Sequence, residues 1–174
     1  MNICVFGSAS EDIGEQYKKN TEAICKALAE CGNNLVFGGG GTGLMGAAAR
    51  GFAAGGGNIY GFIPTFIVDK DVEPPFGKCT SLVETKTMHE RKRNMEELAD
   101  AYLIVPGGIG TMEEFFEILV ARSLGQESKP IVMYNADGYF DNILAFIQKA
   151  VSNVEIHGLV HVKTTPEEVI QTFN

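Results

Sequence analysis

The sequence predicts an α/β protein with a Rossmann-like, open and mostly parallel sheet that carries helices on both faces. Short apolar runs rich in Val, Ile and Phe alternate with segments of helical period, which is the pattern of repeated strand and helix units. Glycines cluster directly after several of the apolar runs. With 174 residues, 45% of them hydrophobic, the chain has the length and apolar content of one domain, residues 1–174.

The elements follow in chain order. Strands are expected near residues 2–6, 34–37, 58–63, 80–84, 101–105, 130–134 and 159–162, with helices between most of them. A first helix is expected over residues 11–31, with a buried stripe and with Gly32 at its C-terminal cap. The stripe consists of Ile13, Tyr17, Ile24, Leu28 and Cys31. Residues 65–78 read as a long loop, which is either functional or a plain connector.

Composition excludes several classes of function. A net charge of −8 and a pI near 4.9 argue against a general nucleic-acid-binding protein, which carries a basic face. No apolar run approaches the roughly 18 residues of a membrane span, and the N-terminus lacks a signal peptide, so we expect a soluble cytoplasmic protein. The four cysteines show no CxxC spacing and are interpreted as buried thiols. The three histidines are scattered, so no metal site is expected.

The first glycine turn spans residues 38–43 and formally satisfies GxGxxG. A dinucleotide site is a poor interpretation, because no carboxylate follows the next strand until Asp69. No Gly-Lys-Ser/Thr follows either, so the turn is not a Walker P-loop. Two interpretations remain open: glycines that let the backbone approach a phosphate, or a tight turn that packs a helix on the sheet.

A second glycine turn spans residues 106–111 and again joins an expected strand to a helix start. Both turns follow strands, and the carboxyl ends of parallel strands are where open α/β sheets bind ligands. Backbone N–H groups at both helix starts are therefore predicted to hold a small phosphorylated ligand. Ser8 and Gly40 are weaker candidates for the same crevice.

Glu114 follows the second turn and has two interpretations. Thr111 and Glu114 form a Thr-x-x-Glu capping box, in which the carboxylate reaches back to a backbone amide. A helix starting at Thr111 also places Glu114 in line with Ile118 and Ala121, on a partly apolar stripe beside the anion-binding end.

Arg91 shares a helix face with apolar residues, because Met88, Met95 and Leu98 lie three or four residues apart along the same stripe. A buried guanidinium needs a carboxylate or a phosphate as partner. Glu114 is one candidate, and a purely structural ion pair between the two is the alternative. The neighbouring Lys92 is expected to be more exposed.

Several motifs resemble those of the LOG family of cytokinin riboside 5′-monophosphate phosphoribohydrolases, which were long mislabelled lysine decarboxylases. Residues 106–114 resemble the family's PGGxGTxxE signature, and residues 88–92 resemble its MHERK segment. Residues 38–46, 61–64 and 137–140 are similar to its GGGxxGLMG, GxIP and DGYYD motifs. The likeness covers nearly the whole chain.

This resemblance implies cleavage of the N-glycosidic bond of a nucleoside 5′-monophosphate, AMP or a cytokinin riboside 5′-monophosphate, without a cofactor. It implies that Arg91 and Glu114 are the catalytic pair, and it implies a homodimer or larger homo-oligomer. The implied substrate-binding residues are Glu73, Arg91, Lys92, Gly107, Gly108, Ile109, Gly110, Thr111, Met112 and Glu113. Glu114 would stabilise an oxocarbenium-like sugar and orient water. The alternative hypothesis is a non-catalytic carrier of a nucleotide or of molybdenum cofactor.

Overall fold

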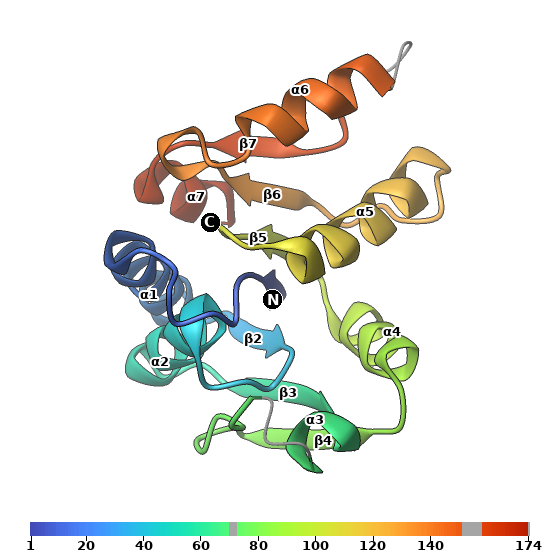
Figure 1. The fold of residues 1–174 in the computed structure, drawn as a ribbon. Coiled ribbons are helices and arrows are strands. Elements are labelled where there is room, and N and C mark those ends of the chain that lie inside the picture. Colours follow the sequence, from blue (N-terminus) through green and yellow to red (C-terminus); the bar gives the residue numbers. More distant parts are fainter. Residues whose placement is uncertain (70–72, 151–157, 174) are drawn as a thin grey trace.

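A computed structural model describes residues 1–69, 73–150 and 158–173. Its seven strands lie in a single parallel sheet in the order β4-β3-β2-β1-β5-β6-β7 (Figure 1). The strands are β1 (Asn2–Phe6), β2 (Asn34–Phe37), β3 (Ile59–Pro64), β4 (Ser81–Thr85), β5 (Ala101–Ile104), β6 (Ile131–Tyr134) and β7 (His161–Lys163). Each expected strand is present with its ends shifted by at most one or two residues, and the predicted fold class is confirmed.

Helices cover both faces of the sheet. One face carries α1 (Glu15–Glu30), α2 (Gly43–Gly55) and α7 (Pro166–Phe173), and the other carries α4 (Met88–Leu98), α5 (Ile109–Ser123) and α6 (Asp141–Ala150). The short helix α3 (Thr65–Asp69) follows β3, and a 3-10 turn, η1 (Ala136–Gly138), follows β6.

Two apolar cores result from the alternation of side chains along the strands. In β1, Ile3 and Val5 belong to the core under α1, α2 and α7. Cys4 and Phe6 point the other way, into the core under α4, α5 and α6. Because both faces of β1 are buried, the strand reads as a continuous apolar run in the sequence.

The first helix is shorter than expected. It begins at Glu15 instead of residue 11, after Gly14 in an extended conformation. Gly32 has a φ of 84° just beyond the helix end, as a C-terminal cap requires. Cys31 was wrongly placed on the buried stripe, because it is the C-cap residue that follows the helix and is exposed. Cys4 and Cys25 are buried, as predicted, and Cys79 is half-buried.

The segment expected as a loop over residues 65–78 is partly helical, since α3 occupies its first five residues. Further along, residues 74–76 attach to the first glycine turn. The amide of Gly41 donates to the carbonyl of Pro74, and the amide of Phe76 donates to the carbonyl of Gly39, both at 2.8 Å. This docking brings the second half of the segment over the carboxyl end of β2. Residues 70–72 lie outside the described residues.

The strand order reverses at β1, which pairs with β2 on one side and with β5 on the other. Chain segments leaving β1 and β5 therefore diverge to opposite faces and open a crevice at their carboxyl ends. There the amide of Ser8 donates to the carbonyl of Pro106 at 3.1 Å and joins the two loops. Within the described part of the chain, no helix combines the length and apolar character needed to cross a membrane.

Candidate functional site

A cavity of about 300 Å³ lies at the carboxyl ends of β1, β2 and β5. Its walls come from the loop after β1, the first glycine turn, helix α4 and the start of helix α5. Polar and apolar groups share the lining. The cavity occupies the position in which open α/β sheets bind ligands.

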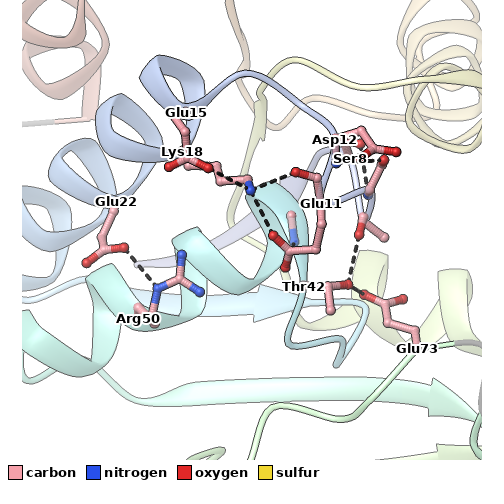
Figure 2. Close-up of polar contacts among 12 residues, drawn as sticks. Ser8, Glu11, Asp12, Glu15, Lys18, Glu22, Thr42, Arg50 and Glu73 are labelled. Atoms are coloured by element: carbon pink, nitrogen blue, oxygen red, sulfur yellow. Dashed lines mark hydrogen bonds and ion pairs between the residues drawn. The ribbon is translucent and has the colours of Figure 1, made fainter.

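Helix α2, which follows the first glycine turn, begins with amides that are already bonded within the protein. The amide of Gly43 donates to the carboxylate of Glu11 at 3.0 Å, and the amide of Leu44 donates to the carbonyl of Ser8 at 2.7 Å. Figure 2 shows Glu11 reaching from the loop before α1, where Lys18 holds it at 2.8 Å. The start of α2 is therefore occupied by the protein's own oxygens, and the expectation that both helix starts offer donors to an anion is wrong for α2.

The glycines of the first turn instead make room for side chains. A Cβ atom on Gly38 would overlap the guanidinium of Arg91, and one on Gly40 would overlap the carboxylate of Glu73. A Cβ atom on Gly43 would lie 2.5 Å from the carbonyl oxygen of Ser8. Of the two open interpretations, the structure favours close packing over direct approach to a phosphate.

The second glycine turn is different. Helix α5 begins at Ile109 with Gly108 as N-cap, and no side chain caps it. In the described residues, the first amides of this helix, those of Ile109, Gly110 and Thr111, donate to no acceptor. A Cβ atom on Gly108 or Gly110 would meet nothing within 4 Å. This helix start is open to a ligand, and its positive dipole end favours an anion.

The predicted capping box is absent. Thr111 lies inside the helix and is 4% exposed. Its side chain packs against Gly107, where a Cβ atom would overlap it. Because the helix starts three residues earlier than a Thr111 cap requires, Glu114 lies beyond the reach of the N-cap amide, and its carboxylate is free for the cavity.

Arg91 and Glu114 face each other across the cavity wall. Nη2 of Arg91 lies 3.8 Å from Oε1 of Glu114, and their side chains are only 13% and 11% exposed. Nε of Arg91 is buried and has no hydrogen-bond partner among the described residues. A guanidinium with unused donors in a cavity is poorly stabilised without an anion.

The environment of Glu114 changes its acidity. Burial raises the pKa of Glu114 to about 7, although the positive charge of Arg91 opposes the shift. The negative charge of Glu113 raises the pKa further. At neutral pH this carboxyl is therefore present in both protonation states, which suits a group that accepts and returns a proton.

Lys92 was wrongly expected to be exposed, because it is 6% exposed. Its ammonium pairs with Glu113 and with Glu117 of helix α5. Burial alone would lower the pKa of Lys92, but the hydrogen bonds that its ammonium donates to these two carboxylates outweigh burial and raise the pKa. The ion pairs join α4 to α5, and Lys92 is not part of the cavity lining.

Glu73 enters the cavity from the segment that docks on the first glycine turn. Its Oε1 lies 3.3 Å from Oγ1 of Thr42, and Figure 2 shows the two side chains facing each other. Burial raises the pKa of Glu73, while Arg91 and Thr42 oppose the rise. Arg91 thus influences Glu73 and Glu114, two of the three carboxyls that line the cavity.

The cavity brings together most of the residues expected at the site. Those that line it are Ser8, Gly40, Glu73, Arg91, Gly108, Gly110, Thr111, Glu113 and Glu114. Four expected substrate-binding residues do not line it: Gly107 is buried beneath Thr111, Ile109 is 91% exposed, Met112 packs into the second core, and Lys92 is ion-paired.

Gly7, Ala9, Gly38, Met45 and Met88 also line the cavity, although none of them was named individually as a site residue. Their signal was their place directly after strands or at helix starts. Glu11 carried no such signal, because its contact with Gly43 spans 32 residues. No cluster of three or more potential metal ligands occurs within the described ranges.

Together, the fold and the site define a Rossmann-like α/β protein with a crevice at the switch point of its sheet, lined by Arg91, Glu114 and the open start of helix α5. A family model described as "Possible lysine decarboxylase" matches residues 45–173. A probable cytokinin riboside 5′-monophosphate phosphoribohydrolase, LOGL6 of Oryza sativa subsp. japonica, is 32% identical over 174 residues, covering 97% of this chain and 68% of that protein. The chain belongs to this family, the LOG family.

Other relatives carry similar names. The probable cytokinin riboside 5′-monophosphate phosphoribohydrolase LOGL9 of Oryza sativa subsp. japonica is 40% identical over 152 residues. Cytokinin riboside 5′-monophosphate phosphoribohydrolase LOG5 of Arabidopsis thaliana is 36% identical over 152 residues. In each case 87% of this chain is covered, and the chain spans 66% and 65% of the two relatives' lengths.

Solved structures share the fold. The molybdenum cofactor binding protein from Rippkaea orientalis superposes with a TM-score of 0.75 at 20% identity, covering 98% of this chain and 93% of that one. The molybdenum cofactor carrier protein from Chlamydomonas reinhardtii gives a TM-score of 0.75 at 22% identity, covering 98% and 94%. At this level of identity the likeness shows the fold alone.

Proposed function

We propose that this protein hydrolyses the N-glycosidic bond of adenine-type nucleoside 5′-monophosphates, AMP or a cytokinin riboside 5′-monophosphate, to free base and ribose 5-phosphate. The observation that carries the proposal is the pair formed by Arg91 and Glu114, 3.8 Å apart and nearly buried beside the open start of helix α5. Relatives named as phosphoribohydrolases support the same reaction class.

The 5′-phosphate is assigned to the start of helix α5. Free amides of Gly110 and Thr111 and the helix dipole favour an anion there. Open space above Gly108 and Gly110 lets a phosphate approach the backbone closely. Arg91 supplies the positive charge, and a phosphate or a charged Glu114 satisfies its unused donors.

Glu114 acts at the sugar. As the bond between C1′ and the base nitrogen breaks, the electron pair leaves with the base and positive charge develops on the ribose. An ionised Glu114 stabilises that charge and takes a proton from the water that attacks C1′. The base leaves with one proton, and ribose 5-phosphate gains the hydroxyl of the water. A pKa of about 7 lets Glu114 accept this proton and release it again near neutral pH.

A non-catalytic carrier is the competing function. A carrier needs the anion site, but carrier function does not explain why the carboxyl of Glu114 is nearly buried beside that site. The charge of an ionised Glu114 would disfavour the binding of an anion there. Neither does the cavity lining support a lysine decarboxylase, because no lysine occurs among the described residues that line it. The phosphoribohydrolase reaction uses both Arg91 and Glu114.

We also propose that the protein forms a homodimer through the apolar faces of α5 and α6. Val120 and Phe146 are 54% and 59% exposed there, and they border one apolar groove. Covering such a patch removes apolar area from water, and a second copy presents a matching surface. Light scattering should give twice the chain mass, and Phe146→Glu should give the monomer. A monomeric wild-type protein would contradict this assignment.

The reaction is tested by incubating the protein with AMP and with N6-isopentenyladenosine 5′-monophosphate, and by measuring the released base by chromatography. Both the base and ribose 5-phosphate should appear in equal amounts. Glu114→Gln should bind nucleotide but release base at least about 100-fold more slowly. If the wild-type protein releases no base from any nucleoside monophosphate, the proposed function is wrong.

A further inference from the structure

The hydroxyl of Thr42 stands between two oxygen atoms. Its Oγ1 lies 2.8 Å from the carbonyl oxygen of Ala9 and 3.3 Å from Oε1 of Glu73. A hydroxyl has a single hydrogen to donate, and a backbone carbonyl can only accept. The shorter contact therefore takes the hydrogen, and the lone pairs of Oγ1 are left facing the carboxyl of Glu73.

Two oxygens in such a contact are compatible only if one of them carries a hydrogen. An ionised Glu73 would place its charge against the lone pairs of Thr42, whereas a protonated Glu73 donates to them. The same side chain packs tightly against Gly40, so the carboxyl has little room to turn away. The arrangement favours the proton on Glu73.

Glu114, another carboxyl of the cavity, has a cation beside it instead of a hydroxyl. The guanidinium of Arg91 lies 3.8 Å away and favours the ionised form of Glu114, against the burial that raises its pKa to about 7. The positive charge of Arg91 also lowers the pKa of Glu73, against the effect of burial. Arg91 therefore acts on both carboxyls, and the contact with Thr42 favours the proton on Glu73.

We propose, on the basis of the function assigned above, that Glu73 is the general acid that protonates the departing base. Glu73 comes from the segment docked on the first glycine turn, whereas Glu114 and the phosphate-binding amides belong to α5. A nucleotide held by its phosphate at α5 extends its base away from that helix, toward the wall that carries Glu73.

The step balances as follows. The bond between C1′ and the base nitrogen breaks, and its electron pair stays with the base. A ring nitrogen of the base takes the proton of Glu73, which becomes a carboxylate. Water adds to C1′ and gives a proton to Glu114. Transfer of this proton from Glu114 to Glu73, through solvent, restores the starting state after products leave.

The test compares two substrates that differ in their need for an acid. Adenine is a poor leaving group unless it is protonated, whereas 4-nitrophenolate leaves without a proton. Wild-type protein and Glu73→Gln are assayed with AMP and with 4-nitrophenyl β-ribofuranoside 5-phosphate. The glutamine amide can still donate to Thr42, so it preserves the contact but has no proton to transfer.

Glu73→Gln should lower kcat for AMP by about 100-fold or more, and kcat for the nitrophenyl substrate by less than about fivefold. Glu84→Gln, which changes an exposed carboxylate on β4, should alter neither. Circular dichroism of each variant establishes that the fold is retained.

An equal loss of kcat on both substrates would overturn the proposal, because a residue that only binds or positions the ribose affects both reactions alike. An unchanged kcat for AMP would overturn it as well. These outcomes leave the proposed function intact. The proposed function fails in a different way, when the wild-type protein releases no base at all.

Discussion

The guanidinium of Arg91 lies 3.8 Å from the carboxylate of Glu114, close enough for charge attraction but too far for a direct hydrogen bond. Both side chains are nearly buried, and Nε of Arg91 has no partner within the described residues. A structural ion pair would close this gap to satisfy its donors. The open pair is therefore better explained by a site that binds a ligand than by a structural ion pair.

The rate should depend on pH through Glu114. Because the ionised form stabilises the sugar cation and accepts the proton of water, kcat for base release should fall as the pH decreases below about 7. Steady-state kinetics between pH 5 and pH 9 measure this decrease in kcat at low pH. The residual rate of Glu114→Gln should not show the decrease. A wild-type rate that stays level down to pH 5 would contradict the assignment of Glu114 as the base.

The free energy of unfolding should also depend on the ionisation of Glu114. Unlike kcat, it should decrease as the pH rises. Burial raises the pKa of Glu114 from 4.5 to about 7, so the folded state prefers the neutral form. Its contribution to stability is complete below pH 4.5 and is lost as the pH rises through about 7. Urea denaturation should therefore find Glu114→Gln equal to wild type near pH 4.5 and more stable by up to about 3 kcal/mol at pH 8. Equal stability at pH 8 would exclude the raised pKa.

Lys92 should affect neither substrate affinity nor the anion site directly. Lys92→Met removes a buried ammonium and leaves Glu113 and Glu117, which are 53% and 42% exposed, in contact with water. We expect the free energy of unfolding to change by about 1 kcal/mol or less, and KM for AMP by less than about threefold. Lys92→Arg is the matched control that keeps the charge. A tenfold rise in KM for Lys92→Met alone would show that Lys92 contacts the nucleotide.

Gly38 should be required for activity more than for stability. An added Cβ overlaps the end of the Arg91 side chain, which is flexible and can move away from the cavity. Gly38→Ala should therefore retain its fold, with the free energy of unfolding changed by about 1 kcal/mol, and should lower kcat/KM for AMP by about tenfold or more. Gly77→Ala, where nothing lies within 4 Å, is the control. An active Gly38→Ala protein would mean that the position of Arg91 is not critical.

The strands, the apolar stripes and the place of the crevice could be predicted from the sequence, because they follow from local periodicity and from glycines after strands. Arg91 was placed correctly by its apolar neighbours Met88 and Met95. The burial of Lys92 could not be predicted, since it depends on Glu113 and Glu117 of another helix. The start of α5 was also missed, because Thr111 satisfies a capping rule locally while tertiary packing starts the helix at Ile109.

Long-range contacts explain the remaining differences. The carboxylate of Glu11 fills the start of α2 from a distant loop, so this helix start resembles a phosphate site in sequence while its first amides are already bonded. Glu73 reaches the cavity because Pro74 and Phe76 dock on the glycine turn. Neither contact has a local sequence signal, since each joins segments about 30 residues apart.

The most direct test of the central claim is the dependence of turnover on the 5′-phosphate. Base release should be measured with AMP, adenosine and ADP under identical conditions, with inorganic phosphate added as a competitor. The amides of α5 and the unused donors of Arg91 predict that AMP is cleaved at least about 100-fold more efficiently than adenosine, as kcat/KM, and that phosphate inhibits competitively. Equal efficiency with adenosine, or no effect of phosphate, would contradict the claim that this crevice binds a nucleoside monophosphate through its phosphate.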